Sequence, residues 1–354
     1  MGSRLQVTVG GVPVGGGAPV VVQSMTNTRP EDLAATLAQI RALATAGAGL
    51  VRVAVPDETG VEAVRRLKAE SPLPLIADVH FDHRLAVAAL RAGAAGVRIN
   101  PGNIGGRKAV AAVVEAARER GAVIRIGVNS GSLERDLRKR EDHDPAGALV
   151  ESVVRYCALL EELDFREIKV SAKSSSPMVT VAANRLLAAR IPYPLHVGVT
   201  EAGTRWAGSI RSAVALGILL EEGIGDTIRV SLTGDPVEEV RVAREILRTL
   251  GLAPRGPRVI SCPTCGRTEI DLEPLALEVE RRLEDLGLDL EVAVMGCAVN
   301  GPGEARKADF GIAGGGREGV VFADGKPVRK VAERDLVDAL FAEIASRHQG
   351  TPGC

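Results

Sequence analysis

The feature that most constrains this fold is a helix-turn-strand unit that recurs along residues 20–250. Each copy has an amphipathic helix, a Gly or Asp turn and a short β-branched run. The clearest copies are Leu43–Val53, Leu90–Ile99, Leu159–Val170 and Leu219–Val230. Glycine at such a turn is typical of a helix C-cap, and similar segments that recur along a chain indicate one repeated structural unit.

Eight strands are predicted in this region: 20–25, 50–55, 74–79, 96–100, 123–129, 167–173, 194–200 and 227–233. Helical segments separate most of them, so the strands should be parallel with right-handed crossovers. Eight such units in about 250 residues is the size of a TIM (β/α)8 barrel. The fold class expected is therefore α/β, a TIM barrel followed by a small α+β domain. A doubly wound open sheet is the competing interpretation, because alternation alone does not prove closure.

The pattern changes after a Pro/Gly-rich stretch at 251–257, which divides the chain into a barrel (1–250), a linker (251–257) and a second domain (258–354). The second domain should contain strands at 258–261, 291–296, 309–314 and 319–323 and helices at 273–286 and 333–346. Residues 5–22 are expected to form a hairpin at the base of the barrel.

Charge and composition exclude several classes of partner. Lys and Arg total 44 against 45 Asp and Glu, a net charge of -1, and aromatic residues are only 2% of the chain. A nucleic-acid or membrane-surface binder would carry a large basic excess. The start lacks an apolar signal region, and the sequence has no long uncharged apolar run. We expect a soluble, cytoplasmic protein without nucleic-acid or membrane partners.

Polar residues occupy the same alternate positions in several predicted strands. In 123–129, Ile124, Ile126 and Val128 alternate with Arg125 and Asn129. Alternate strand residues face opposite sides and helices must cover the apolar side, so the polar residues should point into the barrel. The same rule predicts inward positions for Arg52, Asp78, His80, Arg98, Asn100, Lys169, Ser171, Lys173, His196, Thr200, Arg229, Ser231 and Thr233.

Cations dominate this inward set. An unpaired buried charge is costly, and the clear inward carboxylate is Asp78, with Glu201 close by at a strand end. The excess of inward cations over carboxylates favours a bound phosphate or diphosphate at the mouth of the barrel formed by the carboxyl ends of the strands, where barrel active sites lie. For any single arginine, pairing with an acid from a loop remains an equal alternative.

Three cysteines point to a metal centre in the second domain. Cys262 and Cys265 form a Cys-x-x-Cys turn after a predicted strand, and Cys297 follows another, with six residues between it and Glu304. Three thiolates and a weaker fourth ligand fit a [4Fe–4S] cluster, with Glu304 as an oxygen ligand. On spacing alone, Glu304 could equally be a surface carboxylate.

Other interpretations of these cysteines remain open. A structural zinc site would want another Cys pair or a His partner, and a thioredoxin-type dithiol would need a different strand context. Unrelated buried cysteines are a third alternative. Cys157, in a predicted helix, and Cys354, in the tail, are taken as structural. The rival functions are a zinc-stabilised barrel lyase or pterin-type transferase and an iron–sulfur electron carrier.

Several segments resemble the 4-hydroxy-3-methylbut-2-enyl diphosphate synthase family of the non-mevalonate isoprenoid pathway. They are Val22–Asn27, Asp78–Asp82, Arg98–Asn103, Arg125–Gly131, His196–Gly203, Gly225–Ser231, Cys262–Gly266 and Gly296–Glu304. The resemblance runs from about residue 5 to 345 and implies the bacterial short form. It implies reductive ring opening of 2-C-methyl-D-erythritol 2,4-cyclodiphosphate with loss of a hydroxyl.

The resemblance also implies roles for residues and partners. Cys262, Cys265, Cys297 and Glu304 would hold the [4Fe–4S] cluster, and Glu201 would act near the reacting carbons as a proton source. The diphosphate would be held by Arg52, Arg98, Arg125, Asn129, Lys173, Arg229 and Ser231, with His80 nearby and Asp78 in the same site. Flavodoxin or ferredoxin would donate electrons, and the enzyme would be a head-to-tail homodimer in which one subunit's cluster domain caps the other's barrel. The stretch Val170–Ser176 departs from the family at its acidic end, so the roles of Ser174 to Ser176 stay open.

Overall fold

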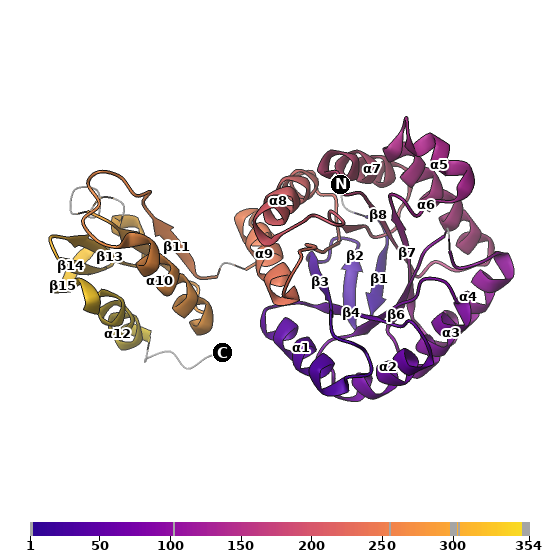
Figure 1. Ribbon diagram of the computed structural model, residues 1–354, viewed down its shortest axis with the longest axis horizontal. Coiled ribbons are helices and arrows are strands. Elements are labelled where there is room, and N and C mark those ends of the chain that lie inside the picture. The colour runs from indigo at the N-terminus through magenta and orange to yellow at the C-terminus, as the bar shows by residue number, and fades with distance from the viewer. Residues whose placement is uncertain (1–2, 102, 255, 298–302, 304, 349–354) are drawn as a thin grey trace. The chain divides into compact units, whose positions relative to one another are not determined.

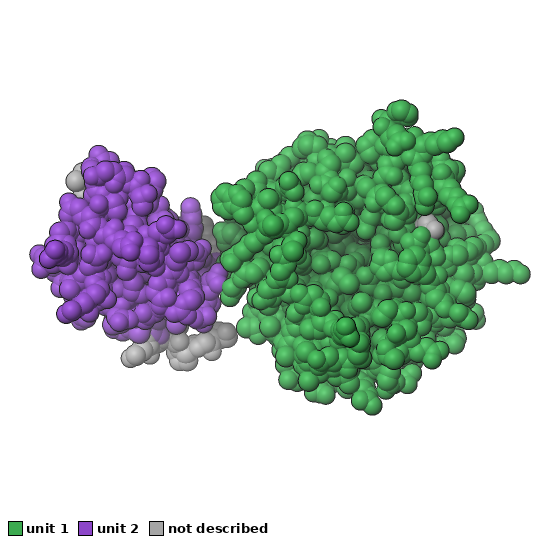
Figure 2. Space-filling model, in the orientation of Figure 1, with its two compact units in different colours: residues 1–253 green, residues 254–354 purple. Residues whose placement is uncertain are grey.

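The computed structural model describes residues 3–101, 103–254, 256–297, 303 and 305–348. Contacts divide the chain into two compact units, residues 1–253 and 254–354 (Figure 2). Each unit has a hydrophobic core of its own, one built around the large sheet and its helices and one between the second sheet and its helices. Among the described residues, no helix combines the length and apolar character needed to span a bilayer.

The first unit is a parallel eight-stranded barrel (Figure 1). In chain order its strands are β3 (Val21–Met25), β4 (Leu50–Ala54), β5 (Leu75–Asp78), β6 (Gly96–Ile99), β7 (Val123–Asn129), β8 (Ile168–Lys173), β9 (His196–Val197) and β10 (Thr227–Ile228). A parallel bridge between Val170 and Leu195 joins the two ends of the sheet, so the barrel closes. The predicted barrel is confirmed, and the open doubly wound sheet is not.

Helices follow the strands and surround the barrel (Figure 1). They are α1 (Leu33–Thr45), α2 (Glu58–Glu70), α3 (His83–Ala92), α4 (Arg107–Arg120), α5 (Arg135–Glu141), α6 (Pro145–Glu162), α7 (Pro177–Arg190), α8 (Arg205–Glu221) and α9 (Pro236–Thr249). Local sequence explains their ends. Asp57 and Asp82 cap the starts of α2 and α3 with side-chain acceptors, and Gly93 and Gly121 end α3 and α4 in the left-handed conformation.

The N-terminal hairpin closes the base of the barrel, as predicted. Strands β1 (Gln6–Val9) and β2 (Val12–Gly15) pair antiparallel. Val7, Val9 and Val14 pack in one buried cluster with residues at the starts of β4, β5 and β7. Because the bottom is filled with apolar side chains, the polar interior of the barrel faces the carboxyl ends of the strands.

The second unit has one five-stranded sheet. Its strands are β11 (Arg258–Ser261), β12 (Glu291–Met295), β13 (Phe310–Gly315), β14 (Glu318–Ala323) and β15 (Lys326–Ala332), with the helices α10 (Leu272–Leu286) and α12 (Leu336–His348). The first three strands run parallel and the last two antiparallel. Strand β15 is not predicted by the sequence pattern, because this exposed edge strand is rich in Lys and Arg and has no apolar alternation.

Candidate active site

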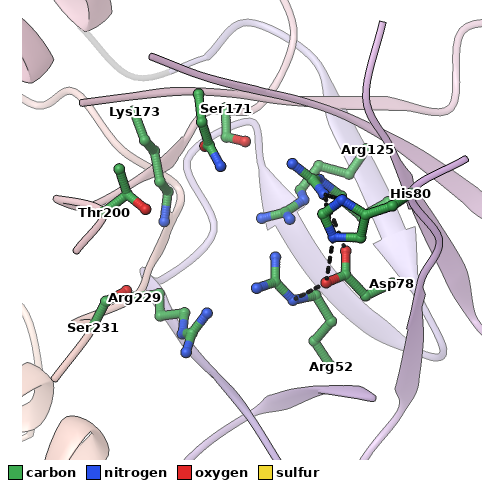
Figure 3. Close-up of a pocket in the computed structure, with 11 residues that line it drawn as sticks. Arg52, Asp78, His80, Arg125, Ser171, Lys173, Thr200, Arg229 and Ser231 are labelled. Carbon is green, nitrogen blue, oxygen red and sulfur yellow. Dashed lines mark hydrogen bonds and ion pairs between the residues drawn. The ribbon is translucent and has the colours of Figure 1, made fainter. Parts of the chain in front are cut away.

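The inward-pointing residues of the barrel strands line one cavity at the mouth (Figure 3). It contains every residue predicted to bind substrate: Arg52, Asp78, His80, Arg98, Arg125, Asn129, Lys173, Arg229 and Ser231, together with Ser171 and Thr200. The volume of this cavity is about 90 Å³. Strand register explains the convergence, since Asp78 pairs with Arg98 and Arg98 pairs with Arg125 across β5, β6 and β7.

Asp78 is the carboxylate at the centre of the cationic wall. It lies 3.6 Å from Arg52, 3.5 Å from Arg98 and 3.4 Å from His80. Burial alone would raise the pKa of Asp78, but Arg52, His80 and Arg98 outweigh it and hold that pKa well below the usual range. Asp78 is therefore ionised and fixes these side chains in place.

Arg125 is a buried cation that forms no ion pair among the described residues, and the attraction of Asp78 only partly offsets its burial. Its side chain is only 3% exposed, and its Nε has no hydrogen-bond partner among the described residues. Burial, followed by repulsion from Arg52 and Arg98, lowers the pKa of Arg125 well below 12.5. A group in this setting is destabilising until an anion is bound next to it.

Lys173 carries a second buried charge to the cavity. Its Nζ lies 3.1 Å from Nε2 of His196, whose Nδ1 lies 2.8 Å from Oγ1 of Thr227. Burial is the main cause that lowers the pKa of Lys173 well below 10.5 and that of His196 well below 6.5, with Arg125 among the further causes. His196 is thus a neutral acceptor, which orients the Lys173 amine.

One carboxylate of the site, Glu239, comes from a helix and is not predicted by the alternation of polar and apolar residues along the strands. Glu239 on α9 is 4% exposed and lies 3.3 Å from Nε of Arg229, and it also accepts from the backbone N–H of Leu232 at 3.0 Å. A signal for it exists, since Glu239 lies on the face of α9 that also buries Val240, Ala243 and Leu247. An acid on the apolar face of a helix indicates a buried partner.

Cations still exceed carboxylates in this cavity. Figure 3 shows side chains of opposite walls pointing into one central space. The cations lining it are Arg52, Arg98, Arg125, Lys173 and Arg229, whereas the buried carboxylates that contact them are Asp78 and Glu239. Guanidinium groups, an amine and the Asn129 and Ser231 side chains suit the oxygens of a phosphorylated ligand.

Glu201, predicted to be catalytic, is placed differently. It follows Thr200, which lines the cavity, but Glu201 itself is exposed and is not a lining residue. Its φ of 52° lies in the left-handed region, which L residues with a Cβ rarely adopt. Such strain is often retained at functional sites.

Two other open questions from the sequence have structural answers. Ser176 caps the start of α7 by accepting from the N–H of Val179, and Thr180 bonds to both the backbone N–H and the carbonyl of Ser174. These serines therefore organise the turn after β8. Cys157 is a buried free thiol whose pKa is raised to about 12, chiefly by burial, which makes it unreactive.

The cysteines of the second unit gather at the carboxyl ends of β11 and β12. The N–H of Gly296 donates to Sγ of Cys262 at 3.3 Å, and the loop after Cys265 returns to the same segment through a bond from Glu269 N–H to the carbonyl of Gly296 at 2.9 Å. Cys297 is buried and Cys265 is exposed. A hydrogen bond from the backbone of Arg267 is the main cause that lowers the pKa of Cys265.

This donor set fits an iron–sulfur centre in its chemistry. Free thiols on adjacent parallel strand ends, a backbone N–H aimed at sulfur and a thiol with a lowered pKa are features of thiolate ligation. Within the described part of the chain, no three His, Cys, Asp or Glu side chains are already arranged to hold a metal ion. Glu304, the predicted fourth ligand, lies outside the described residues.

The fold and its cavity define a TIM-barrel protein with a cationic site at the mouth, joined to a cysteine-bearing α+β unit. The sequence matches the GcpE TIM-barrel domain over residues 4–244 and the GcpE protein C-terminal domain over residues 258–346. The chain therefore belongs to the GcpE family.

Curated relatives share nearly the whole chain. The relative from Geobacter sulfurreducens is 58% identical and that from Lawsonia intracellularis 54%, covering 96% and 97% of this chain and 96% and 95% of theirs. Both are named "4-hydroxy-3-methylbut-2-en-1-yl diphosphate synthase (flavodoxin)".

Solved structures extend the likeness to the barrel fold alone. A type I 3-dehydroquinate dehydratase from Clostridium difficile has a TM-score of 0.51 at 12% identity, and a dihydropteroate synthase from Xanthomonas albilineans has 0.50 at 17%. Each alignment covers 70% of this chain and 97% of the other. At these identities the match shows a shared fold and nothing about chemistry.

Proposed function

We propose that this protein is an oxidoreductase that converts 2-C-methyl-D-erythritol 2,4-cyclodiphosphate to 4-hydroxy-3-methylbut-2-enyl diphosphate, as its curated relatives' names indicate. The observation that carries the proposal is Arg125, which is buried and forms no ion pair among the described residues, in a cavity where cations outnumber carboxylates. A cyclic diphosphate supplies the missing negative charge. A simple electron carrier would have no need for such a cavity.

The barrel residues bind and orient the substrate in this proposal. Arg52, Arg98, Arg125, Lys173 and Arg229 hold the diphosphate by charge-assisted hydrogen bonds. Asn129 and Ser231 supply uncharged donors, and His80 closes the wall beside Asp78. Because Asp78 and Glu239 fix three of the arginines in advance, little of the binding energy is lost to ordering side chains.

Loss of the hydroxyl needs a proton, and we assign it to Glu201. This carboxylate follows Thr200 directly, so it lies next to a cavity-lining residue at the mouth. Its exposed position keeps it in exchange with solvent, from which it can be reprotonated after each turnover.

Cys262, Cys265 and Cys297, with Glu304, hold a [4Fe–4S] cluster in this proposal. When bound, the cluster supplies single electrons and a Lewis acid for the substrate oxygen. The protein's part is to fix the thiolates through strand ends and to donate the Gly296 N–H to the sulfur of Cys262. Thiolate ligands must stay reduced, so we place the protein in a reducing cytoplasm.

The external electron donor in this proposal is flavodoxin, with ferredoxin as the alternative donor. The relatives' names carry flavodoxin. A homodimer completes the proposal and is tested by light scattering of the purified holoprotein.

The decisive experiment is anaerobic purification, iron and sulfide analysis, and turnover of the cyclodiphosphate with reduced flavodoxin. We expect about four irons per chain and formation of the linear diphosphate. A protein that binds zinc in place of iron, or a cluster-loaded protein that leaves the cyclodiphosphate unchanged, would contradict the proposal.

A further inference from the structure

Met25 occupies an unusual position at the end of β3. In the barrel, β3 lies between β4, which carries Arg52, and β10, which Arg229 directly follows. The Sδ atom of Met25 lies 3.1 Å from Nε and 2.9 Å from Nη2 of Arg52, and 3.7 Å from Nη1 of Arg229. One sulfur therefore accepts from two guanidinium groups that both line the cavity.

The ordinary role of a methionine does not account for this position. Methionine usually fills irregular gaps in a hydrophobic core. Among the described residues, however, Met25 belongs to none of the hydrophobic clusters and is not among the apolar residues packed against them. Its sulfur instead contacts the guanidinium groups of Arg52 and Arg229.

The chemistry of the sulfur suits this place. Arg52 and Arg229 repel one another, and burial together with such repulsion lowers the pKa of Arg52 to about 10. A carboxylate between them would cancel charge that the ligand needs, and an alkyl side chain would leave N–H groups without an acceptor. A thioether is a neutral, weak acceptor, so it can hold both groups while their charge stays available.

Each of the two arginines also contacts an acid. Asp78 lies 3.6 Å from Nε of Arg52, and Glu239 lies 3.3 Å from Nε of Arg229. The row Asp78, Arg52, Met25, Arg229, Glu239 thus has a carboxylate at each end and a sulfur in the middle. Figure 3 shows the two guanidinium groups of this row facing the same space.

We propose that Met25 is a positioning residue, whose thioether orients Arg52 and Arg229 toward a bound diphosphate. This inference rests on the proposed function, because it assigns a partner to the same anion site. Met25 itself does not touch the reacting atoms. It acts through the two arginines, so its loss should affect ligand affinity more than the chemical step.

The test compares Met25→Leu with Met178→Leu in the full-length protein. Leucine keeps most of the volume but has no acceptor, and Met178 is an exposed methionine on α7, 56% exposed, that serves as the matched control. Calorimetric titration with inorganic pyrophosphate should show M25L binding about five-fold more weakly, the equivalent of one ordinary hydrogen bond. M178L should bind like the wild type, and both variants should unfold at the wild-type temperature.

Two further measurements separate positioning from packing. Met25→Gln, which restores a neutral acceptor, should recover most of the affinity lost in M25L. With the holoenzyme, M25L should raise KM about five-fold and leave kcat nearly unchanged.

Wild-type pyrophosphate affinity in M25L would overturn the inference while leaving the proposed function intact. Equal losses in M25L and M25Q, accompanied by a lower unfolding temperature, would also overturn it in favour of a packing role. A wild-type protein that binds no pyrophosphate would instead remove the anion site itself, and the proposed function with it.

Discussion

Arg125 is a single side chain whose buried charge lowers the stability of the ligand-free fold. It is buried, its Nε has no partner among the described residues, and its neighbours Arg52 and Arg98 carry the same charge. Removing an uncompensated buried charge stabilises a fold. Removing one partner of a buried ion pair destabilises it, because the other partner is left as an unpaired buried charge. Arg125 and Arg98, neighbours in register, should therefore respond in opposite ways.

We predict that Arg125→Met raises the free energy of unfolding of the ligand-free protein by about 2 kcal/mol. The same variant should bind pyrophosphate at least about ten-fold more weakly, because a charge-assisted hydrogen bond is lost. Urea denaturation and calorimetric titration measure the two effects.

Arg98→Met is the matched control. Arg98 contacts Asp78 and donates to the carbonyl of Gly127 at 3.1 Å, so its removal should lower the free energy of unfolding by about 3 kcal/mol. If R125M and R98M destabilise the protein equally, Arg125 has an internal partner and the anion site loses its main support.

Glu201 combines strain with exposure, which allows stability and activity to be separated. A left-handed conformation costs a residue with a Cβ about 1 kcal/mol relative to glycine. We predict that Glu201→Gly keeps or slightly raises the free energy of unfolding in urea, while turnover of the cyclodiphosphate falls sharply. Glu201→Gln, with the strain retained, should lose the same activity. Normal turnover in both variants would place the proton source elsewhere.

At the scale of strands and helices, alternation in the sequence predicted most of the site. In β7 the order Ile124, Arg125, Ile126 is enough to point Arg125 inward, because helices must cover the other face. The lining of the cavity by Arg125, Lys173 and Arg229 follows from that rule applied strand by strand.

What alternation could not predict are contacts between elements of different kinds. Glu239 contacts Arg229 from a helix. Met25 contacts Arg52 through its sulfur, although a sequence pattern alone would place this methionine in the hydrophobic core. Strand β15 was missed for a related reason, since a charged edge strand is stabilised by its pairing with β14 and carries no apolar signal of its own.

Strands β8 and β9 together predict a pH dependence of stability. Lys173 on β8 faces His196 on β9 and the charges of Arg125, Arg229, Arg52 and Glu239, and its folded pKa lies well below the usual 10.5. Between those two pKa values the unfolded chain binds more protons than the folded one, so the free energy of unfolding rises with pH.

We predict that the unfolding temperature of the ligand-free protein increases as the pH rises toward the usual lysine pKa of 10.5, as linkage requires. Saturating pyrophosphate should flatten this rise, because a bound anion favours the protonated amine. Lys173→Met should remove part of the increase of the unfolding temperature with pH. The part that comes from Lys169 should remain, because the pKa of Lys169 is also lowered, chiefly by burial. A ligand-free protein whose unfolding temperature falls over this range would contradict the shift.

At the scale of the whole molecule, the anion site and the cysteines belong to two units with separate hydrophobic cores. The barrel core includes Ile126 and Val230, behind the anion site, whereas the second core includes Val292 and Val294, on the strand that leads to Cys297. A cluster bound by Cys262, Cys265 and Cys297 ties together segments of the second unit only. Its binding free energy should therefore act on one core and not on the other.

We predict two unfolding transitions in anaerobic calorimetry. Cluster reconstitution should raise the temperature of only one of them, the transition of residues 254–354. Pyrophosphate should raise only the other, because its site lies in residues 1–253. Cys265→Ala removes an exposed thiol and should abolish the first shift, whereas Cys157→Ala, in the barrel, should leave it intact. If both ligands raise a single common transition, the two units fold as one cooperative body, and the separation of electron supply from anion binding has no thermodynamic counterpart.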